Sequence, residues 1–142
     1  MANILEVRAL SKSFGAIQVA NAVSFGVVEG EILGIIGPNG AGKTTLFGML
    51  AGQVEPSAGQ ILFRGEDITA LPPQDRARRG IARTYQVPRP FGQMTVFDNL
   101  RVAAHFAGGL HGADATEWIE RTLAATGLTR YSETLAGRLP LL

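Results

Sequence analysis

The amino-acid sequence predicts an α/β fold in which a phosphate-binding loop joins a buried strand to a helix. Three observations support this prediction: a short apolar run at 31–36, a glycine-rich segment at 37–45, and an apolar helical pattern at 44–51. The chain has 142 residues, of which 46% are hydrophobic and 18% charged, so it is apolar enough to form one domain with a real core. We expect short antiparallel strands, part of a parallel core sheet, and a helical region toward the C-terminal end.

The opening third of the chain predicts several short strands. Residues Ile4–Leu10 and Val23–Val28 are apolar enough to pair as strands, and a turn at 56–59 leads into a third strand at Gln60–Phe63. A turn at Arg64–Gly65 precedes a short strand at 66–68. These segments indicate an antiparallel layer.

The run Glu31–Ile36 predicts a different kind of strand. It is almost continuously apolar, as expected of a parallel strand that is buried on both faces. The helix predicted at 44–51 follows the loop, and Gly52 is placed to end it.

The loop between this strand and this helix carries the clearest chemistry in the chain. It matches the pattern G-x-x-x-x-G-K-[ST] in full, and the alternative, a glycine-rich turn that binds nothing, accounts poorly for the pattern and its flanks together. In such a loop successive backbone N–H groups face phosphate oxygens, the lysine reaches the β- and γ-phosphates, and the hydroxyl ligates Mg²⁺. The predicted phosphate-binding residues are Gly37, Pro38, Asn39, Gly40, Ala41, Gly42, Lys43, Thr44 and Thr45.

The middle of the chain predicts a short helix and a strand before an irregular segment. The helix begins near Leu71 and ends at Gly80, and the strand covers Ile81–Gln86. Two prolines exclude regular structure from 87–92. The basic residues at 76–79 are expected to form a solvated face, with contact to an acidic partner as the alternative.

Two helices are predicted in the last third. The first covers Val96–Phe106 with Thr95 as its N-cap, and its apolar stripe is Val96, Leu100, Ala103 and Ala107. The second covers 114–126, opened by an Asp114/Glu117 pair of the capping-box kind. Its expected buried face is Trp118, Ile119, Thr122 and Leu123, whereas His105 and His111 show no metal-ligand pattern.

Composition limits the classes of partner. The net charge is +1, which gives no reason to expect nucleic-acid binding, and cysteine is absent, which suits a reducing compartment. No segment has the features of a secretion signal or reaches the roughly 18 apolar residues of a membrane span. We expect a cytoplasmic protein that reaches a membrane only through a partner.

The assembled pattern resembles the ATP-binding subunits of ABC transporters, a family with a P-loop NTPase fold, along nearly the whole chain. The segment Leu10–Gly15 is similar to the one whose aromatic residue stacks on adenine, which implies this role for Phe14. The end of the strand at 81–86 is similar to the start of the Q-loop. The resemblance implies that Gln86 senses Mg²⁺ and the water near the γ-phosphate, and that Lys43 and Gln86 act as catalytic residues and Thr44 and Gln86 as metal ligands.

Two stretches resemble the subgroup that serves branched-chain amino-acid importers. They are Gly80–Gln86 and Met94–Leu100. Related subgroups import urea or short amides, so the cargo stays open between these.

The resemblance also implies cofactors, partners and a location. ATP and Mg²⁺ are the expected cofactors, and a second ATP-binding subunit, identical or different, and membrane permease subunits are the expected partners. The subunit would then lie on the cytoplasmic face of the inner membrane. Residues 1–86 would form the nucleotide-binding core with its β subdomain, and residues 87–142 the Q-loop and the start of the helical subdomain.

Nothing in the sequence matches the family's signature loop, its Asp-Glu strand or its histidine loop. We therefore expect a truncated domain that binds ATP but hydrolyses it poorly, because positioning and electrostatics supply nearly all of phosphoryl-transfer catalysis. The apolar run at 32–36 should be left without strand partners, which predicts marginal stability and aggregation. The rival interpretation is a naturally short nucleotide-binding module without turnover, and a cytoplasmic P-loop kinase is a third.

Overall fold

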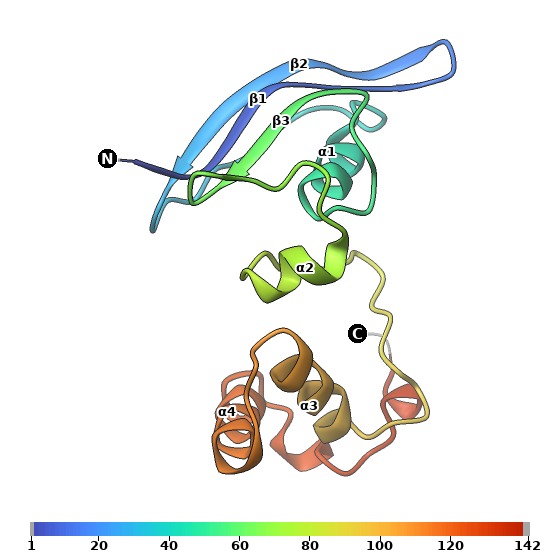
Figure 1. The fold of residues 1–142 in the computed structure, drawn as a ribbon. Helices are drawn as coiled ribbons and strands as arrows, with labels where there is room; N and C mark the ends of the chain where they lie inside the picture. The colour runs from blue at the N-terminus through green and yellow to red at the C-terminus, as the bar shows by residue number, and fades with distance from the viewer. Residues whose placement is uncertain (1, 141–142) are drawn as a thin grey trace. The chain divides into compact units, whose positions relative to one another are not determined.

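A four-stranded antiparallel sheet forms the framework of the N-terminal part. The computed structural model describes residues 2–140 and divides the chain into two units, which meet between residues 76 and 77. In unit 1 the strand order is β2-β1-β3-β4, with β1 at Asn3–Phe14, β2 at Ile17–Val28, β3 at Ala58–Phe63 and β4 at Glu66–Asp67. The antiparallel layer predicted from the sequence is therefore confirmed, with β1 and β2 longer than expected (Figure 1).

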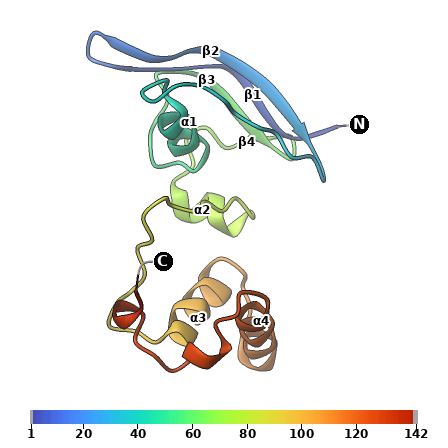
Figure 2. The same cartoon turned by 180° about the vertical axis from the view of Figure 1, so that it is seen from behind.

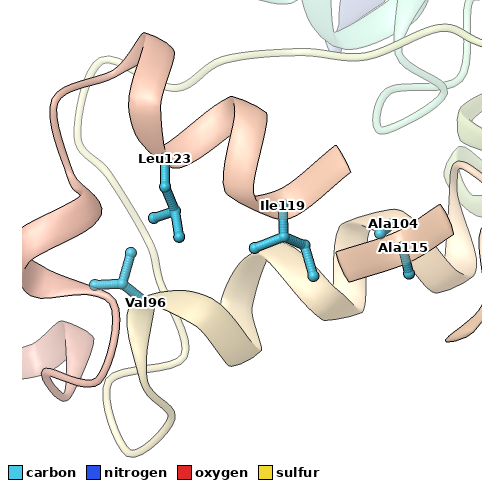
Figure 3. Close-up of a cluster of buried hydrophobic side chains, with 5 residues drawn as sticks. All are labelled: Val96, Ala104, Ala115, Ile119 and Leu123. Carbon is cyan, nitrogen blue, oxygen red and sulfur yellow. The ribbon is translucent and has the colours of Figure 1, made fainter. Parts of the chain in front are cut away.

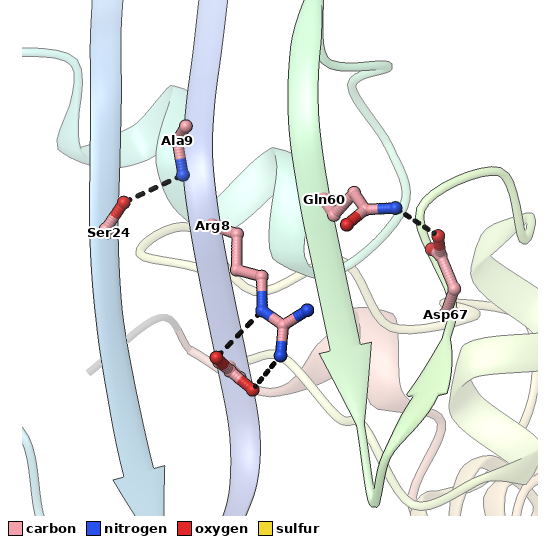
Figure 4. Close-up of polar contacts among 6 residues, drawn as sticks. Arg8, Ala9, Ser24, Gln60 and Asp67 are labelled. Carbon is pink, nitrogen blue, oxygen red and sulfur yellow. Dashed lines mark hydrogen bonds and ion pairs between the residues drawn. The ribbon is translucent and has the colours of Figure 1, made fainter.

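Serine side chains accommodate irregular backbone in the β1–β2 hairpin. Ala9 and Ala22 have positive φ values of 45° and 47°, and the strand register shifts beside them. The Ala9 N–H donates to the Ser24 hydroxyl at 2.8 Å, and the Ala22 N–H donates to the Ser11 hydroxyl at 2.9 Å (Figure 4 shows the first). These bonds satisfy N–H groups that the distorted ladder leaves without a strand partner.

The helix α1, at Lys43–Leu50, lies on one side of the curved sheet in both views (Figures 1 and 2). It begins directly after the glycine-rich loop and ends as the sequence predicts, with Gly52 at φ 77° just beyond it. The side chains that are fully buried in this unit come from the sheet, from α1, from the segment before α2 and from α2 itself; they are Val7, Leu10, Met49, Ile61, Ile68 and Arg76.

Arg76, near the end of α2 (Pro73–Arg78), is 1% exposed, so its assignment to a solvated basic face is wrong. Its guanidinium donates to the carbonyl oxygens of Met49 at 2.6 Å and Leu50 at 2.9 Å, at the C-terminal end of α1. Two further bonds reach Thr69 at 2.8 Å and Leu71 at 2.9 Å. The last carbonyl groups of a helix have no hydrogen-bond donors within the helix, and here an arginine from a later helix donates to two of them.

The strand predicted at Glu31–Ile36 does not form. Ile32 and Ile36 are 97% and 99% exposed, and no strand pairs with this run anywhere in residues 2–140. The strand predicted at Ile81–Gln86 does not form either, since no strand in the described residues pairs with it. A parallel strand needs neighbours on both edges and cover on both faces, so apolar content alone does not create one. The parallel part of the expected core sheet is thus absent from the described residues.

Unit 2 contains the helical hairpin. The helix α3 covers Val96–Phe106 and α4 covers Gly112–Ala125, and two short 3₁₀ turns, η1 at Thr129–Tyr131 and η2 at Ala136–Arg138, follow. Figure 3 shows the apolar cluster between the two helices. Its members are Val96, Ala104, Ala115, Ile119 and Leu123.

The structure of this hairpin confirms one detail of the sequence prediction and contradicts two others. Thr95 caps α3 as expected, since its hydroxyl accepts the Asp98 N–H at 3.0 Å. The capping box at 114/117 is wrong, because α4 begins earlier, after His111. Trp118 is 38% exposed and lies outside the cluster, so its placement in the core is also wrong.

The apolar stripe of α3 passes through Ala104, whereas Ala103 and Ala107 are exposed. Across the part of the chain that is described, no helix combines the length and the apolar character needed to cross a membrane.

A carboxylate at the edge of the sheet gives unit 1 a dependence on acidity. Asp67 accepts hydrogen bonds from the Thr69 hydroxyl and N–H and, at 3.2 Å, from the Gln60 amide (Figure 4 shows the last). The bonds from Thr69, followed by that from Gln60, hold the pKa of Asp67 below its ordinary value of 3.8.

A lowered folded-state pKa makes the ionised Asp67 stabilising above about pH 4. That stability is lost as the pH falls through the folded-state pKa. We expect Asp67→Asn to unfold with a shallower pH dependence below about pH 4 than the unsubstituted chain. Urea unfolding of both proteins from pH 2 to pH 6 measures this, and parallel curves over the acid range would contradict it.

Candidate nucleotide-binding site

The glycine-rich loop leads from the exposed run at 31–36 into α1. Gly40 and Gly42 both have φ 84°, and the Ala41 N–H donates to the Pro38 carbonyl at 3.2 Å, which closes a turn in the loop. Residue Gly42 is the N-cap of α1 and has no side chain with which to cap it. The first N–H groups of a helix lack intrahelical partners, so this end of α1 presents donors and a partial positive charge.

Lys43 is tied to the loop that precedes it. Its ammonium donates to the carbonyl oxygens of Gly37 and Pro38, the second at 2.7 Å. An ammonium has three N–H donors, and these two bonds leave one for an anion. The lysine thus serves both to fix the loop curvature and to place a cation beside the N-terminus of α1.

Contact with β2 fixes the position of Gly42. A Cβ atom added at Gly42 would lie 2.4 Å from the Val19 carbonyl oxygen and 2.9 Å from its Cγ1. A pocket of about 250 Å³ lies between this part of β2 and the loop, and Ile35 and Ile36 contribute to its lining. The loop therefore rests on the sheet, although its own preceding strand is not formed.

The remaining predicted ligands in unit 1 lie at the surface. The Thr44 side chain is exposed in the first turn of α1, and Thr45 is half-buried. Phe14 ends β1 and is 52% exposed, which excludes a core role for this phenylalanine. The Lys12 ammonium lies 5.0 Å from the Phe14 ring centroid and donates to the Glu55 carbonyl at 2.6 Å.

Gln86 belongs to unit 2, where it is exposed at the start of the proline-containing segment. The structure thus brings the loop residues 37–45 together in unit 1 and holds Gln86 in the other unit. Within residues 2–140 there is no cluster of three or more His, Asp or Glu side chains suited to a metal ion. A metal here would take oxygen ligands from hydroxyl, amide, phosphate and water, which is the donor set that Mg²⁺ prefers.

An apolar pocket adjoins the segment that follows Gln86. It has a volume of about 440 Å³, and Pro88 and Pro90 form one part of its lining while side chains of α3 and α4 form another. Leu139 and Pro140, after η2, complete it. The sequence pattern does not predict this pocket, because it depends on how residues 88–90 and 136–140 come together around α3.

Two structural roles have no clear signal in the sequence. Arg76 has no feature that separates it from its exposed neighbours in the basic run. Asn99 binds the backbone of the segment before α3, and in the sequence only the resemblance of the stretch Met94–Leu100 to a family points to it.

Comparisons with known proteins show which proteins this chain is similar to. A family model described as "ABC transporter" matches residues 20–140. The chain is 39% identical to the high-affinity branched-chain amino acid transport ATP-binding protein BraF of Pseudomonas aeruginosa, over 96% of this chain and 59% of BraF. It is 45% identical to the LivG protein of Escherichia coli K12, also named as a branched-chain amino acid transport ATP-binding protein, over 72% of this chain and 40% of LivG.

Another relative has a different cargo in its name. The lipopolysaccharide export system ATP-binding protein LptB of Acidithiobacillus ferridurans is 45% identical over 70% of this chain and 42% of LptB. Among solved structures, an ATP binding subunit of an ABC transporter superposes with a TM-score of 0.85 at 31% identity, over 96% of this chain and 56% of that one. A nucleotide-free ATP-binding cassette gives a TM-score of 0.77 at 30% identity, over 98% and 60%. The chain therefore spans about three fifths of these proteins, or less.

Proposed function

The chain belongs to the ABC transporter family of ATP-binding subunits, and we propose that it binds Mg²⁺·ATP through residues 37–45 and serves the import of branched-chain amino acids. The observation that carries the proposal is the Lys43 ammonium, held by two loop carbonyls beside the N-terminus of α1 with one N–H to spare. A polyphosphate matches this arrangement of a cation and helix N–H donors.

Adenine and magnesium contacts complete the proposed site. Phe14 offers an exposed aromatic ring, and stacking on a base is worth about 1–3 kcal/mol in nucleic-acid systems without specifying the base. We propose that Thr44 ligates Mg²⁺ through its hydroxyl and that Gln86 ligates it through its amide oxygen when the nucleotide is bound. Mg²⁺ neutralises phosphate charge, and an amide ligand does so without titrating.

The proposed partners are a second ATP-binding subunit and the membrane permease, at the cytoplasmic face of the inner membrane. The apolar pocket beside Pro88 and Pro90 supports the permease contact, because an apolar hollow bordered by helices suits an apolar side chain of a partner. The relatives BraF and LivG support branched-chain amino acids as cargo, whereas LptB shows that similar sequences serve other cargoes.

Lys43→Ala tests the binding proposal. Removing one member of a hydrogen-bonded charge pair costs about 2–5 kcal/mol, so the dissociation constant for Mg²⁺·ATP should rise at least about 30-fold. Calorimetric titration measures this, with Arg64→Ala as a control that removes an exposed positive charge from the same unit. An unchanged affinity in Lys43→Ala would show that residues 37–45 do not hold the phosphates.

Turnover tests whether the chain hydrolyses what it binds. We propose that residues 1–142 by themselves hydrolyse ATP only near background, because they contain no match to the family's Asp-Glu strand and positioning and electrostatics supply nearly all of phosphoryl-transfer catalysis. Phosphate release should then be equal in the unsubstituted chain and in Lys43→Ala at saturating Mg²⁺·ATP. Release that is clearly faster in the unsubstituted chain would favour an active ATPase over a binding module without turnover.

A further inference from the structure

The side chain of Asn99, in the first turns of α3, binds one backbone unit from both sides. Its Oδ1 atom accepts the Phe91 N–H at 2.8 Å, and its Nδ2 atom donates to the Phe91 carbonyl at 3.1 Å. The Nδ2 atom also donates to the Thr95 carbonyl of its own helix at 2.9 Å. A single amide therefore joins Phe91 to the start of α3, with both polar groups of the Phe91 backbone paired.

The chain between Gln86 and Phe91 has little freedom of its own. Pro88 and Pro90 fix their φ angles, and each restricts the residue before it to extended conformations. These four residues, two prolines and the two residues before them, form a stiff connection, since proline-rich segments extend with a persistence of several residues.

A second set of bonds holds the end of this connection. The Gly137 N–H donates to the Gly92 carbonyl at 3.1 Å, and the Ala136 N–H donates to the Met94 carbonyl at 2.9 Å. Residues 91–94 are thus fastened on one side by Asn99 and on the other by η2. Since α3 packs on α4 through the cluster of Figure 3, the stiff segment ends on a packed body.

We propose that Asn99 is a positioning residue that fastens the segment 87–91 to α3, so that a displacement of Gln86 moves the α3–α4 pair with it. The inference rests on the proposed role of Gln86 as the sensor of Mg²⁺·ATP. Asn99 passes the displacement of Gln86 on to α3 and touches no nucleotide.

The absence of cysteine allows a direct test on the whole chain. Spin labels are placed in pairs: one at the exposed Ala58→Cys of β3 in unit 1, and the other at Val87→Cys or at the exposed Arg121→Cys of α4. Pulsed electron paramagnetic resonance then gives the distribution of distances between the two labels of each pair, with and without Mg²⁺·ATP. Without substitution at Asn99, Mg²⁺·ATP should shift the distributions of both pairs.

In Asn99→Ala the expected result separates the two pairs. Mg²⁺·ATP should still shift the Ala58–Val87 pair, whereas the shift of the Ala58–Arg121 pair should fall by at least half. The affinity for Mg²⁺·ATP should stay within twofold, which a general loss of folding would not allow. Arg101→Ala serves as the control, because its side chain lies on the surface of the same helix in an ion pair with Asp98, and it should retain both shifts.

Asn99→Asp provides a second variant of nearly the same shape. It keeps an acceptor for the Phe91 N–H but turns a carboxylate oxygen toward the Phe91 and Thr95 carbonyls, so it should also uncouple the Ala58–Arg121 pair. Full shifts of that pair in both Asn99 variants would overturn the inference and leave the role of Gln86 intact. If the Ala58–Val87 pair of the unsubstituted chain does not shift although Mg²⁺·ATP binds, the sensing role of Gln86 fails, and the inference fails with it.

Discussion

Replacing Arg76 with alanine should lower the free energy of unfolding of unit 1 by about 3–5 kcal/mol. The guanidinium donates to four carbonyl oxygens, and two of these, Met49 and Leu50, lie at the end of α1. Leaving buried acceptors without a donor costs about 1–3 kcal/mol each, with partial relief as water enters. Burial lowers the pKa of Arg76 and the Asp67 carboxylate raises it, and the side chain stays protonated at neutral pH.

The position of the aromatic residues makes this measurement selective. The one Trp and both Tyr side chains lie in unit 2, so Trp118 fluorescence follows that unit alone. Hydrogen exchange of the α1 amides reports on unit 1. In Arg76→Ala, exchange protection in α1 should fall strongly while the Trp118 transition stays in place, and in the exposed control Arg78→Ala both should change by less than about 0.5 kcal/mol.

Arg76→Lys makes the test stricter. Lysine keeps the charge but presents three donors on a compact ammonium, which cannot reach carbonyls spread around a planar fork. We expect it to recover only part of the loss. Equal exchange protection of the α1 amides in Arg76→Ala and in the unsubstituted chain would contradict this prediction. It would mean that water replaces the guanidinium without a loss of stability.

Gly42→Ala should weaken the binding of Mg²⁺·ATP far more than Gly40→Ala. Both glycines have φ 84°, so the two substitutions share a backbone strain of about 1–2 kcal/mol. They differ in their surroundings: a Cβ atom at Gly40 meets nothing within 4 Å, whereas one at Gly42 would lie 2.4 Å from the Val19 carbonyl oxygen. The loop must therefore move away from β2 in Gly42→Ala, and α1 moves with it.

The matched pair separates strain from contact. For Gly40→Ala we expect a loss of affinity of about tenfold, because the free loop can relax the strain and must take it up again to bind phosphate, and 1.4 kcal/mol corresponds to a factor of 10. For Gly42→Ala we expect at least a further tenfold loss, measured by calorimetric titration at the same temperature and Mg²⁺ concentration. Equal losses in the two variants would show that the position of the loop on β2 does not matter for the nucleotide.

Local signals in the sequence predicted the elements that depend on local physics. The turn at Arg64–Gly65, the end of α1 at Gly52 and the Thr95 cap follow from residue types whose conformations or side-chain bonds act within a few residues. The phosphate-binding loop was predictable for the same reason, because its glycines and its Lys-Thr ending lie together in the sequence.

Elements that depend on distant partners were not predictable in this way. The apolar runs at 31–36 and 81–86 have the composition of buried strands, but a strand exists only where another pairs with it. The lack of partners at 32–36 was expected from the resemblance to the ABC family and not from the local pattern. The burial of Arg76 depends on α1, which precedes it by more than twenty residues, and the role of Asn99 depends on the path of residues 87–91. Each of these outcomes depends on tertiary contacts, which the local sequence pattern does not contain.

The order of strands in the sheet has a consequence for the kinetics of folding. Leu5 of β1 pairs with Phe63 of β3. This pairing joins residues that are far apart in sequence, with the phosphate-binding loop and α1 between them. The α3–α4 hairpin and the bonds of Asn99 join residues close in sequence. Contacts between distant residues form slowly because the entropy of loop closure must be overcome first. We therefore expect the helical hairpin to form before β3 joins the sheet, and the capacity to hold a nucleotide to be among the last properties that a refolding chain acquires.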